Sequence, residues 1–329
     1  MTKSQVAVII PAFNAERTID ATIRSVRCQT HQDLDVVVVD DGSTDQTPEI
    51  VREHTSCDSR IRLIRQPNSG VAAARNLAIA ETSAPYIAPI DADDLWRPTK
   101  IERQLAQFAC EDDSLGLVYT RCAIIDGGHA IVAIVPEAPS DASALELCRR
   151  NFIGCGSSPM MRRDAVTKAG GYDVTLRARN AEGCEDFKIY FEIATQFRLG
   201  LVAEILTGYR EGQAAMSSDV LRMLNSRELC AADIETRFPE FRNALVEGRL
   251  NILRFNLARA IRNGNVEAIL GMVVRLAQNN PVNVARSFAA LMQKKNNVRL
   301  TPPADRVGQP FMSSLESECK LATQFISAK

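Results

Sequence analysis

The sequence predicts an α/β fold with a mostly parallel central sheet, followed by a largely helical region. Over about the first 110 residues, short apolar runs alternate with segments whose apolar residues recur at helical spacing, as in chains built from β-α-β units. From about residue 219 onward the pattern becomes almost wholly helical. We therefore expect two parts, residues 1–218 and residues 219–329.

The first part contains apolar runs of the kind found in buried parallel strands. Helices cover both faces of such a sheet, so its strands lose the alternation of polar and apolar residues. A segment with apolar residues at helical spacing follows each of the first apolar runs. A further helix is expected over residues 185–194. The expected strands are VAVII (6–10), DVVVV (35–39), IRLI (61–64), YIAPI (86–90), LGLVYT (115–120), SSPMMRR (157–163) and LGLVAEILTGYR (199–210).

The composition is that of a soluble globular protein, with 46% hydrophobic and 24% charged residues in a chain of 329. No apolar segment reaches membrane-spanning length, and we expect no secretory signal. The nine cysteines include no CxxC pair, so we expect reduced thiols and a cytoplasmic location. The net charge is −8 over residues 1–219 and +7 over residues 220–329. This asymmetry suggests different partners for the two parts.

Carboxylates follow two of the predicted strands. Asp40 and Asp41 come at the end of the second strand, and Asp91, Asp93 and Asp94 follow the fourth. Side chains two residues apart on an extended segment point the same way, so Asp91 and Asp93 can converge on a hard divalent cation. The alternative is that Asp93 or Asp94 caps a helix that begins near residue 98.

Seven short motifs occur in order along the first two thirds of the chain. They are VIIPAFNAE (8–16), VVVVDDGSTD (36–45), SGVAAARN (69–76), YIAPIDADD (86–94), GGYD (170–173), ED (185–186) and GYR (208–210). This set resembles glycosyltransferase family 2, the inverting enzymes of the GT-A fold, and covers about residues 4–218. The resemblance implies a Rossmann-like domain that binds a nucleotide sugar and catalyses its transfer.

The resemblance also implies which residues hold the nucleotide. Pro11, Ala12, Asp41 and Asp40 would contact the base and ribose, and Arg75 would approach the nucleotide. These positions agree with the general rule that ligands of α/β sheets bind beyond the carboxyl ends of the strands.

The remaining implied roles concern the metal and the reaction. Asp93 would bind Mn²⁺ or Mg²⁺, and Asp91 would contact the ribose or act as a second metal ligand. Asp186 would be the base that accepts the proton of the acceptor hydroxyl, and Glu185 is the next candidate. Arg210 would lie near the diphosphate.

One departure from the family pattern concerns the metal. Many relatives carry a histidine two residues after the late arginine, whereas this chain has Gly212 there. The three histidines, at positions 31, 54 and 129, lie far from this motif in the sequence. We therefore expect the metal to rely on Asp93, on diphosphate oxygens and on water.

These residues also have structural interpretations. Glu185 and Asp186 stand at a predicted helix start, where acids are favourable without any chemistry. Arg75 could be a solvated helix residue, and Arg210 could pair with a structural acid. The glycines of GGYD could form a turn instead of a site wall.

The predicted function is transfer of a sugar from a nucleotide-diphosphate donor, UDP-linked, to a hydroxyl of a glycan or lipid-linked acceptor, as in polysaccharide biosynthesis. The alternative is a non-catalytic sugar-nucleotide-binding or scaffold protein on the same fold. A nicotinamide dehydrogenase is disfavoured because no G-x-G-x-x-G follows the first strand, and a P-loop NTPase because no G-x-x-x-x-G-K-[ST] occurs.

An apolar stripe in the second part has arginines beside it. The stripe either packs against the catalytic domain or forms part of a surface for an anionic membrane or an acidic glycan. No nucleic-acid recognition motif accompanies the positive charge of residues 220–329, so we expect no nucleic-acid partner. We also expect the catalytic cleft to be built entirely from residues before about 219. The stripe is formed by Leu250, Leu253, Leu257 and Ile261, with Arg249, Arg254, Arg259 and Arg262 beside it.

Overall fold

The computed structural model describes residues 5–135, 141–210, 220–262, 264–279, 287 and 308–312. Nine strands of this part of the chain form one sheet. The strands are β1 (Val6–Ala12), β2 (Leu34–Asp40), β3 (Ile61–Arg65), β4 (Tyr86–Pro89), β5 (Leu95–Trp96), β6 (Leu115–Ile125), β7 (Ile131–Ile134), β8 (Met160–Arg162) and β9 (Arg198–Arg210).

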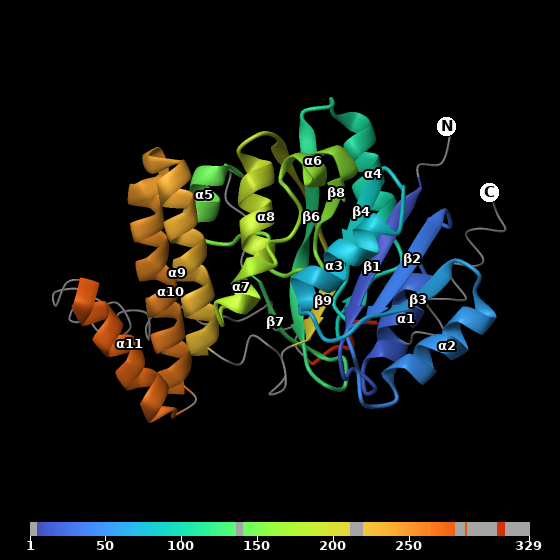
Figure 1. Ribbon diagram of the computed structural model, residues 1–329, viewed down its shortest axis with the longest axis horizontal. Helices are drawn as coiled ribbons and strands as arrows, with labels where there is room; N and C mark the ends of the chain where they lie inside the picture. The colour runs from blue at the N-terminus through green and yellow to red at the C-terminus, as the bar shows by residue number, and fades with distance from the viewer. Residues whose placement is uncertain are drawn as a thin grey trace.

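Helices pack against the sheet and extend beside it. Figure 1 shows α9, α10 and α11 as a group next to α5 and α8, on the far side of the molecule from β2 and β3. The helices are α1 (Ile19–Arg27), α2 (Thr47–Cys57), α3 (Val71–Ala80), α4 (Lys100–Cys110), α5 (Ala144–Arg149), α6 (Arg163–Lys168), α7 (Thr175–Ala178), α8 (Glu185–Ala194), α9 (Val220–Arg237), α10 (Arg242–Arg262) and α11 (Val266–Asn279), with a 3₁₀ turn η2 (Pro239–Phe241).

The sheet is mixed, and its first half matches the prediction of parallel strands. The strand order is β3-β2-β1-β4-β8-β6-β9-β5, and β7 pairs with β6. The neighbours β3, β2, β1 and β4 are parallel, as are β6 and β9. The strand β8 lies between β4 and β6 and is antiparallel to both. The predicted α/β fold is therefore confirmed, with more antiparallel pairing in the second half than we expected.

The strand register brings the ends of three strands to one edge of the sheet. Ala12 pairs with Asp40 across β1 and β2, and Ile9 pairs with Pro89 across β1 and β4. The residues that follow these strands therefore lie close together, although they come from widely separated parts of the sequence. This edge is where a ligand of a parallel α/β sheet is expected to bind.

The carboxyl-terminal helices share the main hydrophobic core. Cys230 and Ile234 of α9 and Leu245 of α10 belong to the same buried cluster as Phe187 and Phe191 of α8. A second cluster joins α9, α10 and α11 and contains Leu224, Leu253, Leu257, Met272 and Leu276. The central leucines of the predicted stripe are thus buried by helix packing, whereas its last member, Ile261, is 44% exposed. The division of the chain between residues 218 and 219 remains a prediction.

Two expectations drawn from composition can be compared with the structure. Seven described cysteines carry free thiols, but Cys28 is disulfide-bonded, so the expectation of nine reduced thiols is wrong for Cys28. Among the described residues, we find no helix with both the length and the apolar character needed to span a bilayer.

A buried lysine stands at the start of α4. The Nζ atom of Lys100 lies 4.0 Å from the centroid of the Trp96 ring and donates a hydrogen bond to Gln104 Oε1 at 2.8 Å. Its side chain is fully buried. Burial disfavours the charged form and lowers the pKa of Lys100 to about 7.

This lysine makes stability depend on alkaline pH. Its pKa is lower in the folded than in the unfolded chain, so unfolding takes up a proton between about pH 7 and pH 10. We expect the free energy of unfolding to rise across this window, relative to Lys100→Met, by at most about 1.4 kcal/mol per pH unit. Denaturant unfolding of both proteins at several pH values measures the difference. Parallel pH profiles would contradict the buried, neutral lysine.

Candidate active site

The acidic motif after β4 forms a tight turn. The amide of Asp94 donates to the carbonyl oxygen of Asp91 at 3.1 Å, so this segment is not extended as we assumed. The side chains of Asp91 and Asp93 are nevertheless close enough to interact. Burial, and after it the charge of Asp91, raises the pKa of Asp93 to about 6. Two acidic groups are thus held near each other with too little positive charge around them.

The third acid of the motif is structural. Asp94 is completely buried, and its carboxylate accepts hydrogen bonds from Ser157 Oγ at 2.5 Å and from the backbone amide of Arg210 at 2.8 Å. Burial and the neighbouring acids raise its pKa well above the usual value. The helix α4 is preceded by Thr99 and has no side-chain cap. The interpretation of Asp93 or Asp94 as its cap is therefore wrong.

A buried arginine faces the acidic turn. Arg75 of α3 is 5% exposed, and its Nη2 atom lies 2.5 Å from Asp91 Oδ1. Burial opposes its charge, but Asp91, together with Tyr172, Asp186 and Tyr190, outweighs this effect and raises the pKa of Arg75. A Cβ atom on Gly156 would come within 2.8 Å of the guanidinium, so only glycine lets this loop approach so closely. The interpretation of Arg75 as a solvated residue is wrong.

The two acids at the start of α8 occupy different surroundings. Both carboxylate oxygens of Glu185 accept from the amide of Gly183 at 2.9 Å, so this side chain turns back to its own backbone. Asp186 accepts from the amide of Phe187 at 2.7 Å. Burial raises the pKa of Asp186, and the charge of Arg75 opposes this rise. Asp186 therefore lies within electrostatic range of the Arg75–Asp91 pair, where a general base with a raised pKa is useful.

The helix α9 fixes the position where α8 begins. Ser226 Oγ accepts a hydrogen bond from the amide of Cys184, the residue before α8, at 3.0 Å. The guanidinium carbon of Arg227 lies 3.2 Å from the centroid of the Phe187 ring. The same guanidinium donates to the carbonyl oxygen of Cys148 at 2.9 Å. Residues after 219 thus support the segment that carries Asp186.

The acids at the end of β2 are tied to protein groups. Asp40 accepts from Arg65 Nε at 2.7 Å and from the amide of Ser43 at 3.0 Å. Asp41 accepts from Gln66 Nε2 at 2.6 Å and from the amides of Ser69 and Gly70 at 2.7 and 2.8 Å. Both acids are buried, beside Pro11 and Ala12 at the end of β1. Their carboxylates therefore hold the loop between β3 and α3 against the ends of the strands.

The guanidinium of the late arginine donates to backbone carbonyl groups. Arg210 Nε donates to the carbonyl oxygen of Asp93 at 2.7 Å, and Nη1 donates to that of Asp126 at 2.9 Å. Burial, and then Arg210, lower the pKa of His129, so this histidine lies nearer to the site in space than in the sequence. No three His, Cys, Asp or Glu side chains of the described segments gather as a metal cluster.

Asn76, which was not among the predicted site residues, holds the GGYD motif in place. Its Nδ2 atom donates to the carbonyl oxygen of Tyr172 at 2.8 Å, and its Oδ1 atom accepts from the amide of Tyr172 at 2.9 Å. The Tyr172 ring lies 5.1 Å from the guanidinium carbon of Arg75. The only sequence signal was the position of Asn76 directly after Arg75 in the ARN motif.

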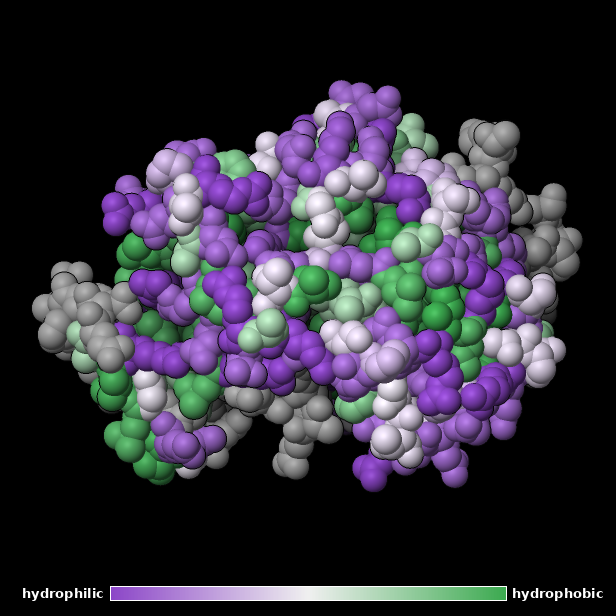
Figure 2. Space-filling view, in the orientation of Figure 1, coloured by the Kyte–Doolittle hydropathy of each residue, from purple (hydrophilic) through white to green (hydrophobic). Residues whose placement is uncertain are grey.

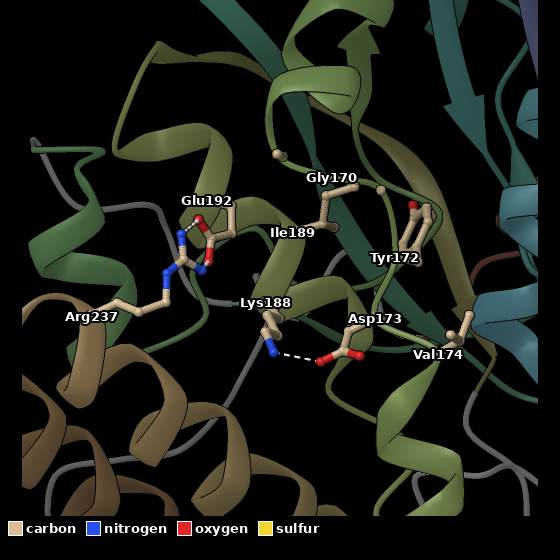
Figure 3. A pocket seen from close by; sticks show the side chains of 10 residues that line it. Gly170, Tyr172, Asp173, Val174, Lys188, Ile189, Glu192 and Arg237 are labelled. Atoms are coloured by element: carbon tan, nitrogen blue, oxygen red, sulfur yellow. Dashed lines mark hydrogen bonds and ion pairs between the residues drawn. The ribbon is translucent and has the colours of Figure 1, made fainter.

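The glycines of this motif form a turn and also line a pocket. Gly170 and Gly171 have positive φ values of 81° and 74°. The pocket has a volume of about 280 Å³ and lies against α8 and α9. Figure 3 shows Lys188 and Asp173 pointing toward one another and, to their left, Glu192 paired with Arg237. The Nζ atom of Lys188 lies 2.5 Å from Asp173 Oδ2. The interpretation of these glycines as a turn is therefore confirmed, whereas their role as a wall of the catalytic site remains a prediction.

Sequence comparison assigns the chain to a family. The family model described as glycosyl transferase family 2 matches residues 7–170. The chain belongs to this family. It is 33% identical over 154 residues to the Bacillus subtilis glycosyltransferase TuaG, named for teichuronic acid biosynthesis, which covers 46% of this chain and 60% of TuaG. It is 35% identical over 151 residues to the Escherichia coli UDP-Glc:alpha-D-GlcNAc-diphosphoundecaprenol beta-1,3-glucosyltransferase WfgD, which covers 46% and 57%. The matches span less than two thirds of these family 2 relatives.

Solved structures support the same GT-A fold. Residues 1–349 of Staphylococcus aureus TarS, crystallised with UDP-GlcNAc, match with a TM-score of 0.63 at 15% identity, over 98% of this chain and 90% of that one. The mannosyltransferase PcManGT of Pyrobaculum calidifontis, in complex with GDP-Man and Mn²⁺, matches with a TM-score of 0.57 at 19% identity, over 99% and 88%. At these identities the likeness concerns the fold of this family 2 chain.

Proposed function

We propose that this protein is an inverting glycosyltransferase that moves a sugar from a UDP-linked donor to a hydroxyl group of a glycan or lipid-linked acceptor. One observation carries the proposal. Asp91 and Asp186 lie around the buried guanidinium of Arg75 at the carboxyl edge of the sheet, and Asp93 lies beside Asp91. The names of the relatives support a role in the biosynthesis of polysaccharides.

The acidic turn is suited to a divalent cation. Hard cations take oxygen ligands, and the raised pKa of Asp93 reports a carboxylate whose charge lacks compensation. Asp93, with Asp91 beside it, would hold Mn²⁺ or Mg²⁺, while the diphosphate and water would complete the coordination. When bound, the metal would stabilise the negative charge of the departing diphosphate.

The residues of this chain would perform the other parts of a single displacement. Asp186 would accept the proton of the acceptor hydroxyl as the new bond forms to the anomeric carbon, which inverts its configuration. Glu185 is less suited to this role, because both of its oxygens are bound to the amide of Gly183. Arg75 would hold Asp91 in place through their ion pair. Arg210 would hold the acidic turn through the carbonyl group of Asp93.

The nucleotide would bind where the strands β1 and β2 end. Pro11 and Ala12 would form the wall beside the base, and Asp41 and Asp40 would act mainly by holding the loop between β3 and α3. Arg75 would lie between the nucleotide and the reacting sugar. A direct contact of Asp41 with the nucleotide would require one of its present partners to move.

The carboxyl-terminal helices would bring the enzyme to an anionic membrane surface on the cytoplasmic side. Residues 220–329 carry a net charge of +7. Val266, Leu270 and Val274 recur every fourth residue along α11 and are 66%, 60% and 53% exposed. Figure 2 shows apolar surface over α11 at the lower left of the molecule. A positive region with an exposed apolar helix face is the kind of surface that binds anionic lipid.

The metal assignment predicts a contrast between two neighbouring acids. Asp93→Ala should abolish Mn²⁺-dependent binding of UDP, measured by calorimetry, without lowering the melting temperature, because it removes a carboxylate that is repelled by its neighbours. Asp94→Ala serves as the control. It should lower the free energy of unfolding by about 2 kcal/mol, because Ser157 and the Arg210 amide lose their buried hydrogen-bond acceptor. Undiminished metal-dependent binding in Asp93→Ala would refute the assignment.

The base assignment predicts a loss of turnover without a loss of donor binding. Asp186→Asn keeps the shape of the side chain but cannot take up a proton. Transfer should fall at least about a hundredfold, while the affinity for UDP stays unchanged. Glu185→Gln is the matched variant and should retain most of the activity. Wild-type turnover in Asp186→Asn would exclude this residue, and donor binding without any turnover in the wild type would favour the non-catalytic alternative.

The membrane proposal predicts salt-sensitive binding to vesicles. The full chain should sediment with anionic liposomes at low salt and much less at high salt, because charges are screened over about 8 Å at physiological ionic strength. Replacing Leu270 and Val274 together by serine should weaken this binding. Val132→Ser, on the 45% exposed Val132 of β7, should leave it unchanged. Equal sedimentation with neutral and anionic liposomes would count against the proposal.

A further inference from the structure

Two cysteine thiols face each other directly behind the acidic turn. The Sγ atoms of Cys122, on β6, and Cys155, in the loop before β8, are 3.5 Å apart. Both side chains are buried, at 1% and 5% exposure. Neither thiol has a part in the proposed transfer reaction. We propose that Cys122 and Cys155 form a reversible disulfide when the protein meets a hydroperoxide, and that this bond weakens binding at the acidic turn.

The surroundings of Cys122 favour the first step of such an oxidation. The hydrogen bonds with Cys155 and Ser158 together outweigh burial and lower the pKa of Cys122. The thiolate is the nucleophilic form of cysteine. Cys122 also lines a cavity of about 10 Å³ with Tyr119 and Phe152. A cavity of this size accommodates about one water molecule, so hydrogen peroxide is a better-sized oxidant than a bulky disulfide.

The chemistry is balanced by the peroxide alone. The Cys122 thiolate attacks one oxygen of hydrogen peroxide, and the O–O bond breaks to give a sulfenic acid and, after protonation, one water. The Cys155 thiol then attacks the sulfenic sulfur, and the S–O bond breaks with release of a second water. The two sulfurs lose two electrons, which reduce the peroxide. A dithiol reductant reverses the bond by thiol–disulfide exchange.

The disulfide would move the loop that holds the acidic turn. An S–S bond is about 2.05 Å long, so the two sulfurs must approach by about 1.5 Å. Cys122 is fixed in a strand that pairs with β7, β8 and β9, so we expect the Cys155 loop to shift. Ser157, two residues later, accepts from the amide of Asp91 at 2.9 Å and donates to Asp94 at 2.5 Å.

The next residue in this loop is equally close to the site. A Cβ atom on Gly156 would meet Arg75 Nη2 at 2.8 Å and Asp91 Oδ2 at 3.0 Å, so the loop backbone lies against this ion pair. A shift of the loop toward Cys122 would therefore disturb both the pair and the hydrogen bonds of Ser157. The consequence for ligand binding rests on the proposed function, whereas the formation of the bond does not.

The test uses the full chain with Cys57 and Cys110, which are exposed, both replaced by serine so that they cannot cross-link molecules. Hydrogen peroxide should remove two hydrogen atoms from the intact mass, and peptide mapping should find Cys122 linked to Cys155. UDP affinity in the presence of Mn²⁺ should fall about tenfold and return with dithiothreitol. Cys155→Ser and Cys122→Ser should each prevent both effects. Cys148→Ser, at a buried cysteine elsewhere in the core, should prevent neither.

The outcomes separate the two proposals. Absence of the Cys122–Cys155 cross-link at peroxide concentrations that oxidise Cys57 and Cys110 of the wild type would overturn the disulfide. A cross-link with unchanged UDP affinity would overturn its effect on the acidic turn. Failure of the reduced protein to bind UDP would instead refute the proposed function, and the mass measurement would still decide whether the bond forms.

Discussion

The buried carboxylate of Asp94 is the interaction on which the geometry of the site depends. It joins the turn after β4 to Ser157 in the loop before β8 and to the backbone of Arg210 at the end of β9. A carboxylate without solvent is costly unless hydrogen bonds compensate for its lost hydration. Here both oxygens have donors, so the cost of burial is offset only when all three segments meet. The same residue therefore makes the arrangement specific.

The position of Asp91 and Asp93 follows from this anchor. The turn brings them together with Arg75 beside Asp91 and Arg210 beside Asp93, and burial still leaves the charge of Asp93 incompletely compensated. The raised pKa of Asp93 is the measurable consequence. A divalent cation would complement the unbalanced negative charge at the end of this central strand. Asp91, Asp93 and Arg75 are therefore poorly suited to stabilising the fold and well suited to binding a ligand.

Much of the fold could be predicted from the sequence because its signals are local. The helix over residues 185–194 was predicted with the bounds that the structure gives, since Phe187, Tyr190, Phe191 and Ala194 repeat along one face. The parallel strands were recognisable from continuous apolar runs. The antiparallel direction of β8 had no such signal, because a strand of three residues carries no period and its direction is set by its neighbours. The candidate site residues were identified from motifs at the ends of strands. The sequence of the motif did not distinguish Asp94, which supports the site, from Asp93, which is accessible to a ligand.

The contacts that the sequence could not reveal join residues far apart in the chain. The side chain of Asn76 forms hydrogen bonds with the backbone of Tyr172, and the side chain of Ser226 accepts one from the backbone of Cys184. A hydrogen bond from a side chain to a backbone group does not depend on the residue type of the partner. Such contacts therefore leave no pattern in the sequence. The contact from Ser226 also shows that the positively charged second part of the chain is joined structurally to the first part. A positive helical region could have been an independent surface, yet its first helix sets the start of α8.

This placement resolves the competition between two effects on Asp186. The start of a helix favours an ionised acid, whereas burial favours the protonated one. The net result is a raised pKa, so burial outweighs the combined influence of the helix and of Arg75. The helix α9 contacts the beginning of α8 on either side of this position, through Ser226 at Cys184 and Arg227 at Phe187. The carboxyl-terminal helices therefore help to set the pKa of Asp186, and a ligand that binds those helices would act on the helix that carries the proposed base.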